Sequence, residues 1–184
     1  MAINLYNGFY NKVTLEQFRC ISFDRQAFTF EWTLQPLGYV PFEHIHINQD
    51  EVFHIKTGEI RLLIEDREYI GKAGDSITVP RGKRHVAFNN KAAVLTCWVE
   101  YKPGLDTYTF FQCFGGLTID EDMNKKGQIS IPRMCYFTKK MRAQCITRPT
   151  SIPAPVFDFV INCFYIIGLV LGWKKFFVKY TDVS

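Results

Sequence analysis

Short stretches in which apolar and polar residues alternate follow one another from about residue 26 to residue 101. Residues two apart in a β-strand point to the same side of a sheet, so this alternation predicts strands with one buried face. Turn-forming residues separate the stretches. Many short strands at this spacing indicate an all-β sandwich or barrel rather than βαβ units. The segments that we expect to be strands are 28–34, 51–58, 59–66, 76–80, 84–89 and 93–101.

The pattern changes after the KPG turn at 102–104. Three longer apolar segments follow, and their length and mixed period suit helices better than strands: TYTFFQCFGG, IPRMCYFTKKMRAQC and PVFDFVINCFYIIGLVLGW. NKKGQ and RPTSIPAP supply the breaks between them. We therefore predict an N-terminal segment that packs on a barrel (1–27), the β-barrel itself (28–104) and a mainly helical C-terminal extension (105–184).

The last apolar run is compatible with two placements. Residues 159–173 carry no charge, and residues 155–173 approach the roughly 20 apolar residues that a membrane-spanning helix needs. Lys174 and Lys175 follow like a basic flank. Asp158 and Asn162 lie inside the longer run, which opposes spanning. The run therefore predicts either a helix packed on the protein or on a partner, or membrane association through 155–173.

Composition removes one class of partner and suggests a compartment. The chain has 184 residues, 47% of them hydrophobic and 22% charged, which is enough for a real core. Its net charge is only +4 and no basic run is interleaved with aromatic residues, so we expect no nucleic-acid partner. The six cysteines form no CxxC pair, and the N-terminus lacks the pattern of a signal peptide. Reduced thiols and a cytoplasmic location are the expectation.

The four histidines lie within or close to two of the predicted strands. In EHIHINQDE (43–51), His44 and His46 share one face of a strand, and Glu51 begins the next strand. His85 lies in PRGKRHVAFN (80–89). His54 falls on the face opposite Glu51, so we exclude it as a ligand. Imidazole and carboxylate together suit one divalent transition-metal ion, such as iron, manganese, nickel, copper or zinc.

The spacing of these residues resembles the two consensus motifs of the cupin superfamily, over roughly residues 30–104. The first motif is filled by Gly38, His44, His46, Glu51 and Gly58, and the second by Gly74, Pro80, Gly82, His85 and Asn89. The resemblance implies an antiparallel jelly-roll β-barrel whose mouth binds one metal ion through His44, His46, Glu51 and His85. It also implies an open position for water or substrate, and a homodimer. We expect Asn89 to be a hydrogen-bonding residue in a turn or at the end of a strand rather than a ligand.

Such a site supports two kinds of chemistry. As a Lewis acid, the ion supports isomerase or lyase reactions, and as a redox ion it supports a dioxygenase. Cupins include dioxygenases, isomerases, storage proteins and sugar-binding regulators, so the resemblance does not choose between them. The aromatic stretches FTFEW and CWVEY suggest an apolar cavity and a small, partly hydrophobic organic substrate. We therefore expect a mononuclear metalloenzyme, first a dioxygenase, second an isomerase or lyase, with a non-enzymatic small-ligand-binding cupin as the alternative.

The sequence does not identify a general acid or base. Glu43 alternates to the face away from His44, which weakens it as a candidate. Other polar or aromatic residues flank the ligands or lie on predicted strands whose register the sequence does not fix: Tyr39, Arg61, Trp98, Glu100 and Tyr101. The catalytic residues therefore stay unassigned at this point.

Overall fold

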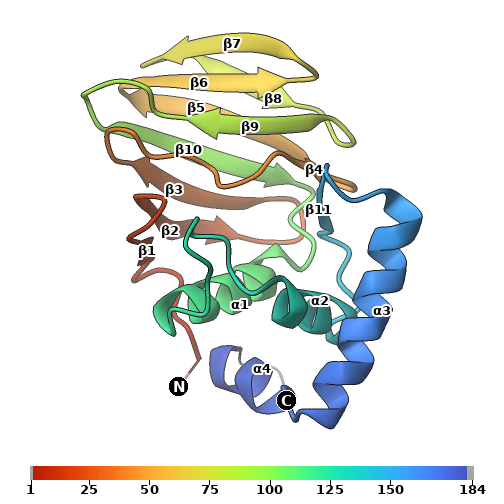
Figure 1. Ribbon diagram of the computed structural model, residues 1–184. Helices are drawn as coiled ribbons and strands as arrows, with labels where there is room; N and C mark the ends of the chain where they lie inside the picture. Colours follow the sequence, from red (N-terminus) through yellow and green to blue (C-terminus); the bar gives the residue numbers. More distant parts are fainter. Residues whose placement is uncertain (1, 182–184) are drawn as a thin grey trace.

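The computed structural model of the protein describes residues 2–181 and contains two antiparallel β-sheets that face each other (Figure 1). In spatial order, the first sheet consists of β1 (Phe9–Asn11), β2 (Glu16–Phe23), β3 (Phe28–Leu34), β10 (Leu95–Lys102), β5 (Asp50–Thr57) and β8 (Ser76–Val79). The second sheet consists of β11 (Thr147–Pro149), β4 (His44–His46), β9 (Arg84–Phe88), β6 (Glu59–Ile64) and β7 (Arg67–Lys72). The predicted antiparallel jelly-roll class is confirmed.

The predicted closure into a barrel is wrong. Within the part of the chain that is described, strand pairing gives two separate sheets. Their edge strands are poor templates for further pairing, because β8 has four residues, β11 has three, and most of the side chains of β7 are exposed. The two sheets therefore contact each other through inward-pointing side chains rather than through a continuous ladder.

The core between the sheets is aromatic. The sequence FTFEWTL of β3 buries every second residue, as the alternation predicts: Phe28, Phe30, Trp32 and Leu34. Burying each such side chain contributes roughly 1.5–3 kcal/mol, so this one strand face is a large stabilising element. The neighbouring strand β10 pairs with β3 over its first seven residues, which places Val99 opposite Phe30 and Tyr101 opposite Phe28.

The turn between β5 and β6 requires a glycine. Gly58 has a φ of +78°, and a Cβ at this position would lie 2.6 Å from the carbonyl oxygen of Val94. Any side chain would therefore be strained and would clash with backbone. The tight turn at Gly58 follows directly on β5, the strand that carries Glu51.

Two strands lie before residue 28, in the segment that we expected only to pack on the barrel. β2 pairs with β3, with one register shift between Cys20 and Ser22. Its side chains alternate, so that Glu16, Phe18 and Cys20 are buried on the inner face. The N-terminal segment is therefore part of the first sheet.

Four helices occupy the C-terminal part: α1 (Thr107–Ile119), α2 (Ile131–Lys140), α3 (Ala154–Val170) and α4 (Lys174–Tyr180). They gather beyond one end of the sheets (Figure 1). The helix α1 packs against β1, α2 and α4, and α2 packs against α3. The segment IPRMCYFTKKMRAQC, which was predicted to be helical, contains α2, and this helix buries Met134 and Phe137.

One carboxylate connects the start of α1 to the chain that leads into β11. Asp106 accepts hydrogen bonds from the backbone N–H groups of Gln144 and Cys145, at 3.0 and 2.9 Å. β11 then pairs with β4 in antiparallel register, with Thr147 opposite His46. The C-terminal extension is thereby joined to the strand that carries two of the candidate ligands.

The apolar run at the end of the chain is split between two helices. Among residues 2–181, none of the helices by itself has the length and hydropathy of a membrane span. The helices α3 and α4 meet this criterion only as a pair, and they are bent by 95° at the break between them.

Candidate metal centre

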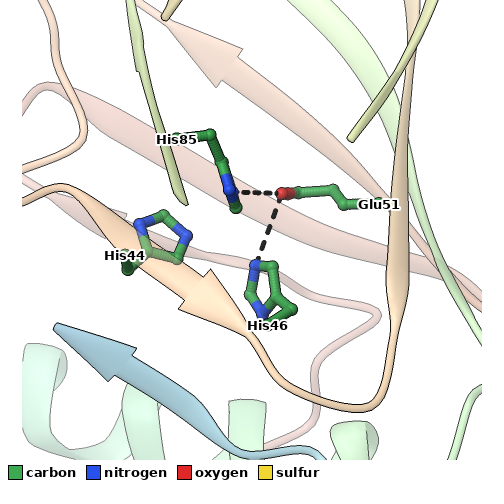
Figure 2. Close-up of side chains that lie close together, drawn as sticks. All are labelled: His44, His46, Glu51 and His85. Atoms are coloured by element: carbon green, nitrogen blue, oxygen red, sulfur yellow. Dashed lines mark ion pairs between the residues drawn. The ribbon is translucent and has the colours of Figure 1, made fainter. Parts of the chain in front are cut away.

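Four side chains from three strands meet inside the fold (Figure 2). His44 and His46 lie on β4, Glu51 on β5, and His85 on β9, directly opposite His44 in the β4–β9 pair. One potential ligand atom from each side chain lies within 4.8 Å of the others. The structure thus brings together the four residues that the resemblance named.

Three of the ligand atoms are buried and lack hydrogen bonds. His85 Nε2 lies 2.8 Å from Glu51 Oε2, and His46 Nε2 lies 3.3 Å from the same oxygen. None of these three atoms makes a hydrogen bond of acceptable geometry. Ligands bound 2.0–2.2 Å from one ion at right angles would be about 3 Å apart. The observed separations therefore suit atoms that share a cation.

Two of the imidazoles are held by backbone carbonyls on their far side. His44 Nδ1 lies 3.2 Å from the carbonyl oxygen of Phe42, and His85 Nδ1 lies 3.1 Å from that of Lys83. A carbonyl oxygen can only accept, so each Nδ1 carries a proton, and in the neutral form of each ring Nε2 keeps its lone pair for an ion. Metal-binding histidines are typically oriented in this way.

The third imidazole is held by the C-terminal extension. His46 Nδ1 lies 3.1 Å from the hydroxyl oxygen of Thr147 on β11. If His46 offers Nε2 to an ion, its Nδ1–H donates to this hydroxyl. Sequence reasoning missed Thr147, because a residue in a three-residue strand beside a proline gives no pattern. Only its position opposite His46 reveals its role.

The electrostatics favour a charged carboxylate beside imidazole. Burial opposes ionisation of Glu51, but the charges and close contacts of His46 and His85 outweigh it and hold the pKa of Glu51 well below its usual range. Burial lowers the pKa of His85, yet its close contact and charge interaction with Glu51 produce a net increase. The pKa of His44 lies well below 6.5, because of burial and then repulsion by His85 and His46. A neutral His44 is ready to act as a ligand at neutral pH.

Tyr101 lies against the cluster. Its ring centroid is 4.8 Å from that of His46, and the side chain is buried. Burial raises the pKa of Tyr101 well above 10, and the nearby charge of Glu51 raises it further. The hydroxyl is therefore a proton-bearing donor at neutral pH, next to the carboxylate of the site.

The fourth histidine lies outside the site, as the alternation predicts. His54 points to the outer face of the first sheet, where its Nδ1 is 2.9 Å from the Ser76 hydroxyl. Its Nε2 is 3.6 Å from Glu100. His54 is therefore a natural control for experiments on the other three.

Most of the residues considered from the sequence as a general acid or base point away from the ligand cluster. Glu43 accepts a hydrogen bond from Thr150 at 2.8 Å, and it does not belong to the ligand cluster. Arg61 pairs with Glu68, and Trp98 is partly exposed beneath the ammonium group of Lys56. Of the residues considered as a general acid or base, Tyr101 alone lines the cavity next to the ligand cluster.

Asn89 is a hydrogen-bonding turn residue, as expected. Its side-chain amide donates to the carbonyl oxygens of Leu34, Gln35 and Ala93. These bonds satisfy three backbone acceptors where β3, the loop after it and the start of β10 meet. Asn89 therefore stabilises the end of the sheets rather than contributing a ligand.

The cluster opens into a cavity of about 150 Å³. Both sheets line it, and so do residues of the C-terminal extension, including Phe110, Gln128 and Thr147. Most lining side chains are aromatic or aliphatic, and neither lysine nor arginine is among them. Such a wall suits a compact, largely apolar molecule and offers no cation besides a bound metal to a phosphate group.

A second acid lines the same cavity away from the ligands. Glu16 is 3% exposed, and its Oε1 accepts a hydrogen bond from the indole N–H of Trp32 at 3.1 Å. Burial raises the pKa of Glu16 to about 8, although hydrogen bonds from Thr14 and Trp32 act in the opposite direction. Sequence reasoning missed this residue, although its alternation with Phe18 and Cys20 carries the signal for an inward position.

Two facing antiparallel sheets and a three-histidine, one-carboxylate cluster define a double-stranded β-helix protein with a candidate metal centre. Residues 30–99 match the family model described as the cupin domain. The comparison thus identifies a cupin domain in this segment of the chain. No curated protein matches the sequence.

Solved structures with similar folds are remote in sequence. An uncharacterised conserved protein with a double-stranded β-helix domain from Klebsiella pneumoniae is 18% identical, with a TM-score of 0.44, over 47% of this chain and 71% of that one. A sugar phosphate isomerase of the cupin superfamily from Silicibacter pomeroyi is 22% identical, with a TM-score of 0.44, over 47% and 59%. A predicted oxalate decarboxylase from Thermotoga maritima is 18% identical, with a TM-score of 0.45, over 48% and 80%.

Proposed function

We propose that the protein is a mononuclear metalloenzyme that binds one divalent transition-metal ion through His44, His46, Glu51 and His85. The observation that carries this proposal is the set of buried atoms without hydrogen bonds, at 2.8 and 3.3 Å around one carboxylate oxygen. Leaving such groups unpaired is costly, and a shared cation removes the cost. Three imidazole nitrogens and one carboxylate oxygen suit iron, manganese, nickel, copper or zinc.

The cavity supports a substrate class. Its wall is largely apolar and lacks lysine and arginine, which disfavours phosphorylated sugars. A compact aromatic or enediol-like molecule with two adjacent oxygens suits both the apolar wall and a metal at one end. When bound, a redox-active ion supplies the means to bring such a chelating molecule and O₂ together, so we propose a dioxygenase.

The chain's own residues would orient the substrate and exclude water. The aromatic wall surrounds the apolar part of the molecule and lowers the local dielectric constant. Tyr101 is placed to donate a hydrogen bond beside Glu51. Glu16 offers a carboxyl group at a second polar position of the same cavity. These residues would position the substrate, and an ion held by only four ligands would leave a further position for it.

The second candidate is an isomerase or lyase that uses the ion as a Lewis acid. The same ligand set supports it, since zinc or manganese needs no change of donors. A non-enzymatic cupin that binds a small ligand would use the same cavity without turnover. The three candidates differ in one property, because only the dioxygenase consumes O₂ in proportion to substrate.

The test is oxygen uptake by protein loaded in turn with Fe²⁺, Mn²⁺, Ni²⁺, Cu²⁺ or Zn²⁺, supplied with a panel of catechols and enediols. Glu51→Gln is the loss-of-site variant and His54→Ala the matched control. The expected result is uptake with a redox-active ion that Glu51→Gln loses and His54→Ala keeps. Substrate conversion without O₂, or with Zn²⁺ alone, would replace the dioxygenase by the isomerase or lyase. Binding without any conversion would favour the ligand-binding module.

A further inference from the structure

The carboxyl group of Glu16 lies in the cavity wall without a cation beside it. The residue is 3% exposed, and within residues 2–181 its carboxyl oxygens have no ion-pair partner within 4.0 Å. The indole N–H of Trp32 donates to its Oε1 at 3.1 Å, and such a donor favours the ionised form of a carboxyl group. A buried carboxyl group either keeps its proton or receives a cation from a ligand.

Aromatic rings flank this carboxyl group. Phe18 follows Glu16 on the same face of β2, and β2 pairs with β3 so that Trp32 lies opposite Phe18. The ring of Phe114 on α1 meets that of Phe18 edge to face, with 5.3 Å between the ring centroids. All three rings line the cavity. The faces of aromatic rings carry partial negative charge and attract cations, so the rings and the acid favour the same kind of ligand group.

Glu16 and the candidate metal centre belong to different ends of the first sheet. Glu16 lies opposite Leu34, the last residue of β3, whereas Tyr101 beside the ligand cluster lies opposite Phe28, the first residue of β3. The carboxyl group of Glu16 forms no hydrogen bond or ion pair with the four candidate ligands. A molecule bound in the cavity would therefore meet the ion with one end and Glu16 with the other.

We infer that the Glu16 end of the cavity binds the ammonium group of a primary amine, so that the substrate is an aromatic or enediol-like molecule with an aminoalkyl substituent. The inference rests on the proposed function for the end of the substrate that meets the ion, whereas amine binding at Glu16 needs no ion. On binding, the carboxyl group releases its proton to water, and the ammonium group then balances the carboxylate. Burial raises the pKa of Glu16 to about 8, and an alkylammonium group loses its proton only near pH 10, so the bound pair is ionic.

Other ligand groups fit this end of the cavity less well. A carboxylate or phosphate would face the acid and the negative faces of the rings, and neither lysine nor arginine lines the wall to balance it. A neutral carbonyl or hydroxyl group would accept the Glu16 proton but would gain nothing from the aromatic faces. The combination of an unpaired acid and aromatic rings therefore favours a cation.

The test compares three probes that differ mainly in the charge of one end: 2-phenylethylamine, 2-phenylethanol and 3-phenylpropanoate. Each is titrated by calorimetry into the full chain at pH 8, near the pKa of Glu16. The amine should bind roughly 10- to 100-fold more tightly than the alcohol, the effect of a hydrogen bond to a charged group, and the carboxylate should bind most weakly. An alcohol that binds as tightly as the amine, or an amine that does not bind, would overturn the inference.

Variants of the acid locate the binding. Glu16→Gln should abolish the preference for the amine and leave alcohol binding unchanged, because glutamine still accepts a hydrogen bond from Trp32 but carries no charge. Glu16→Asp keeps the charge and should retain part of the preference. Glu31→Gln is the matched control, because Glu31 lies on the other face of β3 and pairs with Arg19 at 2.9 Å. A preference for the amine that survives in Glu16→Gln would contradict the inference.

The same titrations with Glu51→Gln separate amine binding from the metal centre. This variant should lose the metal and keep the preference for the amine, whereas loss of the preference would show that the amine binds the ion and would overturn the inference. A wild type without metal that still prefers the amine would overturn the proposed function alone.

Turnover gives a further readout if catechols support O₂ uptake. The KM for 4-(2-aminoethyl)catechol should then be lower than that for 4-ethylcatechol. Glu16→Gln should raise the first KM only, with kcat unchanged for both. Equal KM values for the two catechols in the wild type would contradict a substrate with an amine.

Discussion

The hydroxyl of Thr147 lies 3.1 Å from Nδ1 of His46, although the two residues are 101 positions apart in the sequence. The contact arises because β11 pairs with β4 at this point. A segment outside the matched cupin domain therefore orients a residue inside it. The C-terminal extension is part of the candidate metal centre rather than an appendage.

Removal of this hydroxyl should weaken metal binding without unfolding the protein. In Thr147→Val the Nδ1–H of His46 loses its acceptor, and the ring loses its fixed orientation. Loss of such a partner typically reduces metal affinity by about 10- to 100-fold. Competition with a chromophoric chelator measures this affinity.

Thr150→Val is the matched control for Thr147→Val. Thr150 lies in the same segment, but its hydroxyl donates to Glu43 instead of contacting a candidate ligand. We expect wild-type affinity in this variant. Equal affinity of Thr147→Val and Thr150→Val would show that the His46–Thr147 contact has no effect on the centre.

Stability should decrease with rising pH because of Glu16. Its pKa is about 8 in the folded protein, against 4.5 for an unperturbed glutamate, since burial disfavours the charged form. The folded state therefore binds more protons than the unfolded state between these values. The resulting stabilisation is complete below about pH 4.5 and is lost as pH rises through 8. The free energy of unfolding should fall by up to about 1.4 kcal/mol per pH unit in this window.

Urea unfolding at pH 5, 6, 7 and 8 measures this slope. Glu16→Gln keeps an acceptor for the indole N–H of Trp32 but cannot ionise, so its slope should be smaller than that of the wild type. Glu68→Gln, on the exposed strand β7, should retain the wild-type slope. If the free energy of unfolding changed with pH equally in the wild type and in Glu16→Gln, Glu16 would not be a buried neutral acid.

Gly168→Ala should destabilise the protein, although alanine is the better helix former. Alanine in a helix interior usually gains up to about 1 kcal/mol over glycine. Here the added Cβ would lie 2.3 Å from the buried ring of Tyr136, and overpacking of this kind costs about 1–3 kcal/mol. A lower melting temperature than the wild type is expected.

Asn162→Ala on the exposed side of α3 provides the comparison for Gly168→Ala. It adds helix propensity without adding an atom to the core, so its melting temperature should not fall. If Gly168→Ala were as stable as Asn162→Ala, the contact between α2 and α3 would have to be looser than the structure indicates.

The alternation of side chains along each strand predicted the part of the site that depends on local geometry. The two-residue period put His44 and His46 on one face and separated His54 from Glu51, and the structure agrees because these strands are regular. The spacing between motifs supplied His85. The alternation in 28–34 likewise gave β3 with its correct ends.

The missed features depend on contacts between distant segments. Glu16 belongs to a regular strand that was not predicted within residues 1–27, and its burial becomes evident only from its position in the cavity wall. The strand β7 was not among the predicted strands, because nearly all of its side chains are exposed and leave no alternation of buried and exposed positions. Thr147 acquires its role only when β11 meets β4, and no local period records that pairing.

The most direct test of the metal centre is metal analysis by mass spectrometry of protein purified without added metals. The account predicts about one transition-metal ion per chain in the wild type and in His54→Ala. It predicts near-complete loss of bound metal in His85→Ala and Glu51→Gln, while the β-sheet content measured by circular dichroism stays unchanged. Full metal content in both site variants, or a folded wild type that takes up no metal even after incubation with Fe²⁺ or Zn²⁺, would contradict it.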